Sequence, residues 1–170
     1  MKKYKLEFQS FSDVITNSSS TVFLVDNDTA EELTKMVPSE CLWKHEFTWD
    51  MICPEVLNIS DISTLTLTQE DEIERILYTV EDNAKILFDI LSPYKDKLVI
   101  KHQELFDFTN IYGLDKLVAK MYYDFCQDNK ELIEDKLIGK IYVDIEDHFE
   151  NPEEVYDYAK DHSIWWEYCH

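Results

Sequence analysis

The strongest periodic pattern in the sequence runs from Thr68 to Pro93. Its apolar residues recur at the spacing of one helical face, and charged residues occupy the opposite face. The polar segment from Thr68 to Asp71 predicts the N-terminal cap, and Pro93 predicts the end, because proline cannot continue a helix. Hydrophobic residues make up 45% of the chain, as expected of a packed globule in which such a helix buries its apolar face.

Alternation of apolar and polar residues marks the strands of a sheet. Before the last strand, Asn151 and Pro152 predict the start of a helix, since they are favoured at the cap and at the first helical position. The predicted order of strand, helix and strand at the C-terminal end favours a crossover connection, which would make the two strands parallel. An antiparallel return of the last strand is the alternative. The predicted strands are residues 4–8, 22–25, 98–100, 140–147 and 164–168.

The remaining segments add helices. Asp28 and Glu31 have the spacing of a capping box, and the helix that they begin should end before Pro38. Residues 39–67 predict a short helix and then irregular chain, and residues 113–129 predict an amphipathic helix. The sequence therefore predicts one α+β domain, residues 1–170, with a small, mostly antiparallel sheet of about four or five strands and helices packed on it.

The charge of the chain is its most unusual property. There are 36 acidic and 16 basic residues, which gives a net charge of −20 and a pI near 4.4. Direct binding of nucleic acid needs a basic surface, so this class of function is excluded. Only two glycines occur, Gly113 and Gly139, and they cannot form the glycine-rich loops that bind phosphates.

The N-terminal segment and the cysteines suggest a compartment. Residues 1–10 contain lysines but lack the apolar stretch of a signal peptide, and no apolar run is long enough for a membrane span. The cysteines are scattered without a CxxC pair, which is typical of reduced thiols. We therefore expect a cytoplasmic protein of a bacterial host cell, with no membrane partner.

A polar segment near the N-terminus is the most distinctive stretch of the chain. Its central residues predict an ordered loop, because Ser and Asn side chains bond nearby backbone groups. The alternative is a hydroxyl-rich pocket for a polar ligand or a serine nucleophile, but the glycines that flank a nucleophilic serine are absent. This polar loop consists of Thr16, Asn17, Ser18, Ser19 and Ser20.

Residues 10–20, followed by the aromatic Phe23, resemble the opening of small bacteriophage and bacterial proteins with an ITNSSS-like N-terminal motif. The resemblance covers about fifteen residues. It implies a phage or mobile-element setting and carries over neither an activity nor a catalytic residue.

Asp144 and Glu146 form the pair most similar to a metal site. They lie about 7 Å apart on one strand face, a spacing that could hold a divalent ion, with His148 nearby. The alternative is that both carboxylates belong to a solvated, acidic outer face of this strand. The upstream Gly-Ser turn of a nucleotidyltransferase and the downstream lysine of a nuclease are absent from the sequence. Cys41 and His45 could share a helical face but lack a second short-spaced pair for zinc. The sequence thus predicts no metal, cofactor or catalytic residue, and favours a protein that is not an enzyme.

The C-terminal segment concentrates the charge. Residues 142–170 contain nine acidic residues and one lysine, with aromatic residues between them. Such a surface can bind a basic partner, because carboxylates attract it and aromatic side chains add contact area. The predicted partner-binding residues are Asp144, Glu146, Asp147, Glu150, Glu153, Glu154, Asp157, Asp161, Trp165 and Trp166.

The sequence therefore favours an acidic intracellular inhibitor that binds a basic protein surface. One form of it is an anti-CRISPR-like counter-defence protein of a phage that mimics nucleic acid on a nucleic-acid-processing enzyme. Two alternatives stay open: a divalent-metal-dependent phosphodiester or nucleotidyl enzyme using Asp144 and Glu146, and an accessory phage structural protein.

Overall fold

The computed structural model describes residues 19–59, 66–106 and 116–169. Its contacts divide the chain into two compact units. The described residues from 48 to 136 form a helical unit, and residues 19–47 together with residues 137–169 form a sheet unit. The expected strand at residues 4–8 lies outside the described residues. The single domain of residues 1–170 stays a prediction.

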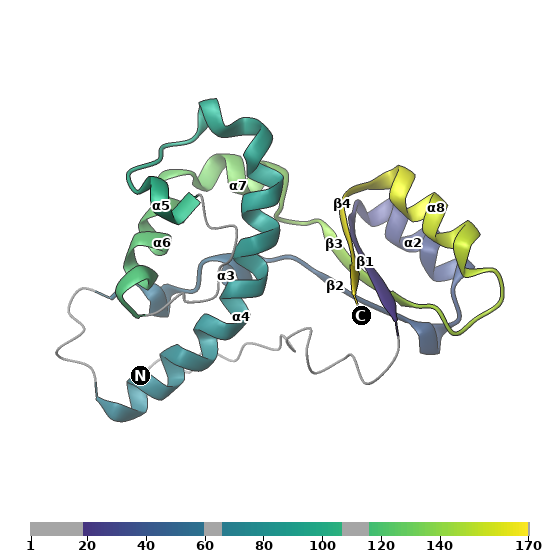
Figure 1. Ribbon diagram of the computed structural model, residues 1–170, viewed down its shortest axis with the longest axis horizontal. Coiled ribbons are helices and arrows are strands. Elements are labelled where there is room, and N and C mark those ends of the chain that lie inside the picture. The colour runs from purple at the N-terminus through teal and green to yellow at the C-terminus, as the bar shows by residue number, and fades with distance from the viewer. Residues whose placement is uncertain (1–18, 60–65, 107–115, 170) are drawn as a thin grey trace. The chain divides into compact units, whose positions relative to one another are not determined.

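The sheet unit contains a four-stranded antiparallel sheet (Figure 1). The α+β class and the mostly antiparallel sheet are therefore confirmed. Two predicted strands, residues 22–25 and 164–168, are each slightly longer in the structure than the alternation indicated. In spatial order the strands are β2 (Leu42–Glu46), β3 (Ile141–Glu146), β1 (Ser20–Val25) and β4 (Ser163–Cys169).

Two helical connections link strands that are not neighbours in the sheet. Helix α2 (Asn27–Met36) joins β1 to β2, and α8 (Pro152–His162) joins β3 to β4. Because β3 and β4 both run antiparallel to β1 between them, they are parallel to each other. The crossover connection is thus the correct alternative, and the order of the strands is that of a split β-α-β, or ferredoxin-like, sheet.

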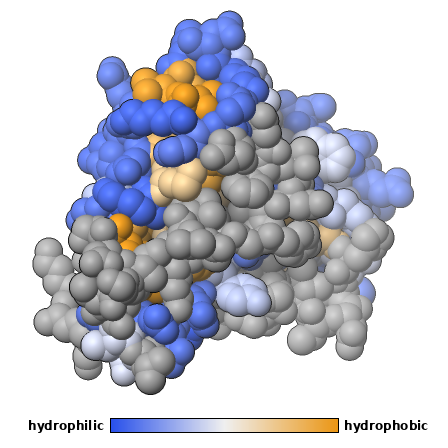
Figure 2. Space-filling view, turned by 60° about the vertical axis from the view of Figure 1, so that its left-hand side comes forward, coloured by the Kyte–Doolittle hydropathy of each residue, from blue (hydrophilic) through white to orange (hydrophobic). Residues whose placement is uncertain are grey.

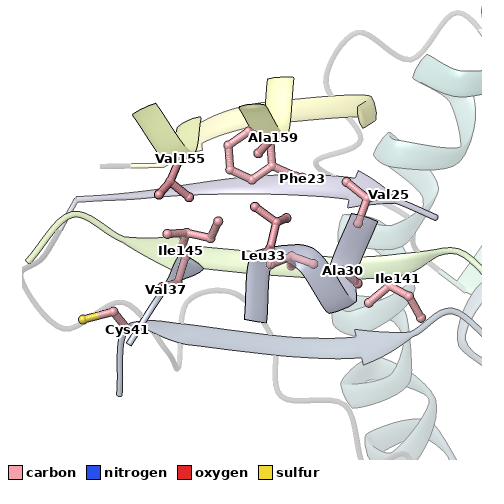
Figure 3. Close-up of a cluster of buried hydrophobic side chains, with 11 residues drawn as sticks. Phe23, Val25, Ala30, Leu33, Val37, Cys41, Ile141, Ile145, Val155 and Ala159 are labelled. Atoms are coloured by element: carbon pink, nitrogen blue, oxygen red, sulfur yellow. The ribbon is translucent and has the colours of Figure 1, made fainter. Parts of the chain in front are cut away.

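The core of the sheet unit lies between the sheet and these two helices. Alternate residues of β1 and β3 point to this face, and the buried faces of α2 and α8 cover them. Figure 3 shows their side chains pointing toward one another. Phe23 is fully buried, and its ring lies 6.1 Å from that of Tyr156. The cluster comprises Phe23, Val25, Ala30, Leu33, Val37, Cys41, Ile141, Val143, Ile145, Val155 and Ala159.

The helical unit is built around one long amphipathic helix. Its apolar stripe is buried, as the sequence predicted, and Phe88 packs against Tyr122 and Phe125. Figure 2 shows one side of the surface, where hydrophilic residues surround small apolar areas. The helices are α3 (Trp49–Ile52), α4 (Leu67–Leu91), α5 (Gln103–Phe106), α6 (Lys116–Asp128) and α7 (Lys130–Lys136), with 3-10 turns at Glu55–Leu57 and Ser92–Lys97.

The starts of two helices, α4 and α2, differ from the predicted ones. Thr66, rather than Thr68, caps α4, because the Thr66 hydroxyl accepts a bond from the Gln69 amide while the Gln69 side chain bonds back. Asp28 lies inside the first turn of α2 instead of capping it. After Leu91 the chain continues as a 3-10 turn that contains Pro93, since proline is tolerated at the start of a new turn.

Two segments were predicted wrongly. Residues 42–46 form β2, whereas we expected a short helix and then irregular chain. The strand was missed because it is short and its exposed Lys44 and Glu46 leave little apolar alternation in the sequence. A 3-10 turn, Ser39–Cys41, precedes it. Residues 98–100 are not a strand. Instead, the Asn129 side chain pairs with the backbone of Val99.

Replacing Asn129 by alanine is expected to lower the free energy of unfolding by about 2 kcal/mol. The buried amide of Asn129 accepts a bond from Val99 N–H at 2.7 Å and donates to the carbonyls of Val99 and Phe125 at 2.9 and 2.8 Å. Urea denaturation measures the loss. Gln127→Ala is the control, because Gln127 is exposed two residues away. Equal stability of both variants would show that these three bonds contribute nothing.

Candidate functional site

Helices α2 and α8 contact each other and cover the same face of the sheet (Figure 1). Each helix buries one side against the sheet, so its polar residues lie on the outer side. All their acidic residues are exposed. We call this group the α2–α8 surface; it comprises Asp28, Glu31, Glu32, Glu153, Glu154, Asp157 and Asp161.

Two lysines on these helices neutralise little of this charge. Lys35 donates to Glu32 at 2.8 Å, and this bond raises the lysine pKa. Lys160 lies over the Trp166 ring, with its Nζ 4.5 Å from the ring centroid. Seven carboxylates against two ammonium groups leave the α2–α8 surface strongly negative.

Strand β4 places an apolar row beside α8. Trp166 lies opposite Phe23, and Tyr168 lies opposite Thr21, so both point to the face that carries the helices. Ile164 is also exposed, at the point where the register between β1 and β4 shifts by one residue. These three residues, which we call the β4 row, are each 47% exposed.

The other face of the sheet carries buried polar groups. Asp144 is only 4% exposed, and burial raises the pKa of its carboxyl group, with Ser20 acting against this rise and Glu146 adding to it. His45 stacks on Tyr142 at 4.7 Å between ring centroids, and burial lowers the pKa of His45 to about 4. Within the described part of the chain, neither Ser20 Oγ nor Asp144 Oδ1 has a partner with good hydrogen-bond geometry.

Asp144→Asn is expected to stabilise the protein at about pH 8, by roughly 1 kcal/mol, the usual scale for one buried polar group. Because the folded-state pKa is raised, Asp144 favours folding below the ordinary carboxyl pKa. That contribution is lost as the pH rises through the folded-state pKa. The stability difference between the variant and the parent should therefore vanish near about pH 4.

Urea denaturation of both proteins across this pH range measures the difference. The titration of His45 is common to both proteins and cancels. Glu150→Gln, at an exposed position, is the matched control and should show no such pH dependence. A difference for Asp144→Asn that does not change with pH would contradict the raised pKa.

The candidate metal residues differ in how far they are exposed to solvent. Asp144 is buried, Glu146 is half-buried, and His148 is exposed with its Nδ1 3.6 Å from Asp147 Oδ1. Cys41 lies in the core of the sheet unit, whereas His45 lies on the opposite face, since residues 42–46 are a strand and not a helix. Among the described residues, no three His, Cys, Asp or Glu side chains are grouped closely enough to hold a metal ion.

The predicted partner-binding residues divide between the two faces of the sheet unit. Trp165 lies opposite Leu24 on the face away from the helices, so only Trp166 joins the α8 side. Asp144 is buried, whereas we expected it to lie on a solvated, acidic face of its strand. Glu146 and Asp147 are half-buried, whereas Glu150, Glu153, Glu154, Asp157 and Asp161 are exposed.

The polar loop is described only at its end. Thr16, Asn17 and Ser18 lie outside the described residues, Ser19 is half-buried, and Ser20 begins β1 instead of belonging to a loop.

Sequence reasoning missed the contribution of α2. Its three acidic residues are visible in the sequence, but their position beside α8 depends on the strand order, which brings together helices more than a hundred residues apart. Ile164 and Tyr168 were also missed. The alternation in β4 could have indicated that they share a face with Trp166.

The helical unit contains a small pocket with a volume of about 30 Å³. Val99, Leu105, Met121 and Phe125 form its apolar lining. The ion pair between Lys101 and Asp128, at 2.9 Å, lies at the same pocket. None of the residues predicted for a site belongs to this lining.

No family model, curated protein or solved structure matches the chain. The four cysteines are free thiols. No helix in the described part of the chain is long and apolar enough to cross a membrane.

Proposed function

We propose that this protein binds a basic surface of another protein, and that its α2–α8 surface occupies the place of a nucleic-acid backbone there. The observation that carries this proposal is the gathering of seven exposed carboxylates on two adjacent helices. A net charge of −20 exceeds the roughly 2–8 units that solubility requires of a small domain.

The spacing of the charges supports nucleic-acid mimicry. Helix α8 carries four acidic residues in 11 residues, which is one carboxylate per about 4 Å of helix at a rise of about 1.5 Å per residue. A single nucleic-acid strand carries one phosphate per about 3.4 Å. Glu153, Asp157 and Asp161 follow one another at i, i+4 and i+8, so they form a line along one side of the helix.

This charge would act mainly on the rate of association. Charged surfaces of opposite sign steer two proteins together and raise the association rate by about 10- to 1,000-fold at low salt. At about 0.15 M salt the Debye length is about 8 Å, so the carboxylates must come close to the partner to hold the complex.

The N-terminal resemblance gives this proposal a setting. In a phage or mobile element, a protein that occupies the nucleic-acid groove of a host enzyme would act as an anti-CRISPR-like counter-defence inhibitor in the bacterial cytoplasm. The metal-dependent alternative finds less support, because Asp144 is buried and its raised pKa disfavours the charged form that a metal requires.

Capture with DNA competition tests the proposal. The immobilised protein is incubated with a bacterial lysate cleared of nucleic acid, and bound proteins are released with added duplex DNA or with salt. We expect a nucleic-acid-binding protein that duplex DNA displaces. A partner that salt releases but duplex DNA leaves bound would contradict nucleic-acid mimicry.

A further inference from the structure

The β4 row is an exposed apolar surface that the protein keeps next to its strongest charge. Ile164, Trp166 and Tyr168 are each 47% exposed, at alternate positions along an edge strand of the sheet. Burying such side chains is favourable, and Trp and Tyr are the residues most often found at the energetic centre of interfaces. A partner that binds this row must also suit the charged residues around it.

The contact between Lys160 and Trp166 shows one chemistry that this row accepts. The ammonium group lies 4.5 Å from the ring centroid, within the range of a cation–π interaction. The Trp166 ring is thus placed so that a positive charge can stack on it. An arginine suits the position better than a lysine does, because its planar guanidinium group stacks on aromatic rings and is more weakly hydrated.

Carboxylates lie on the same side of α8 as Lys160. Asp157 precedes Lys160 by three positions and Glu153 precedes it by seven, so the three side chains project from one side of the helix. Both acidic residues are exposed. A cation that stacks on Trp166 would therefore find carboxylates within reach for charge-assisted hydrogen bonds.

We propose that the β4 row binds an arginine-bearing segment of the basic partner, with Trp166 stacking on a guanidinium group and the α8 carboxylates pairing with it. This inference rests on the proposed function and adds the chemical identity of the residue that is recognised. Charge argues for this occupant over a second copy of the chain, because two copies would bring together surfaces of a molecule with a net charge of −20.

Binding of synthetic peptides tests the inference, and this test does not require that the partner be identified. Short fluorescein-labelled peptides carry arginine, lysine or glutamine alternating with alanine, and fluorescence anisotropy measures their affinities. We expect the arginine peptide to bind about 3-fold more tightly than the lysine peptide, and the glutamine peptide not to bind. Trp166→Ala should weaken the arginine peptide about 5-fold and remove its advantage over the lysine peptide.

Two controls separate stacking from charge. Tyr78→Ala removes a 76% exposed aromatic side chain from the helical unit and should leave the affinities unchanged. Lys160→Gln removes the ammonium group that lies over the Trp166 ring and so uncovers the face of the ring. The substitution should therefore increase the affinity for the arginine peptide more in the parent than in the Trp166→Ala variant, which has no ring to uncover.

The outcomes distinguish this inference from the proposed function. Suppose that the Trp166→Ala variant binds both peptides as tightly as the parent, whereas neutralising the acidic residues of α8 abolishes binding. The β4 row then has no role in recognition and the inference is overturned, but the role of the α2–α8 surface in the proposed function is supported. If the parent binds no arginine peptide, the inference is overturned. Self-association that Trp166→Ala abolishes, measured by analytical ultracentrifugation, would also overturn it, because the row would then hold a second copy.

Discussion

Phe23→Ala is expected to lower the free energy of unfolding by about 3–5 kcal/mol. Phe23 is fully buried in β1 and belongs to the cluster between the sheet and its two helices. Its removal leaves a cavity that the surrounding β-branched side chains of Val155 and Val143 cannot easily fill. Most small domains have only about 5–15 kcal/mol of stability, so the sheet unit would lose much of its own.

Urea denaturation followed by circular dichroism measures this loss. Tyr78→Ala, at an exposed position of α4, is the matched control and should change the stability by less than about 0.5 kcal/mol. The predicted single domain adds a second expectation, since all probes should then follow one transition. A loss below about 1 kcal/mol for Phe23→Ala would contradict the position of this side chain in the core.

Neutralising the acidic residues of α8 is expected to slow association with a basic partner by about 10- to 100-fold at low salt. The change removes the line of carboxylates that we propose contacts the partner, whereas the sheet and the apolar sides of the helices are kept. Stopped-flow measurement with the captured partner gives the rate. The variant combines Glu153→Gln, Glu154→Gln, Asp157→Asn and Asp161→Asn.

A second variant with the same change in net charge is the control. Its substitutions lie at exposed positions of the helical unit: Asp50→Asn, Asp71→Asn, Asp96→Asn and Glu131→Gln. We expect it to slow association by less than about 3-fold, because none of its four substitutions belongs to the α2–α8 surface. An equal effect of both variants would show that net charge, and not the α2–α8 surface, governs binding.

The periodic segments of the fold were predictable from the sequence. The alternation of residues 140–147, the start at Asn151 and Pro152, and the closing strand indicated β3, α8 and β4 because local preference and tertiary burial agree there. The stripe of α4 was recognised for the same reason. Its cap was misplaced by two residues, since both Thr66 and Thr68 offer a hydroxyl group to an early helical amide.

The features that depend on pairing were not predictable. Strand β2 is held by its register with β3, in which Trp43 lies opposite Asp144, and its own sequence carries little strand signal. The same pairing buries Asp144, which the alternation had placed on a solvated face. Helix α2 becomes part of the candidate site only because β1 lies between β3 and β4, a fact that no local pattern contains.

Carboxyl footprinting of the complex tests whether the α2–α8 surface contacts the partner. Exposed carboxylates are labelled with a carbodiimide and an amine, and mass spectrometry compares the protein alone with the protein bound to its captured partner. Strong protection of Glu153, Asp157 and Asp161, with Asp71, Asp96 and Glu131 labelled as before, is the predicted result. Unchanged labelling of the α2–α8 surface in the complex would contradict the claim that this surface binds the partner.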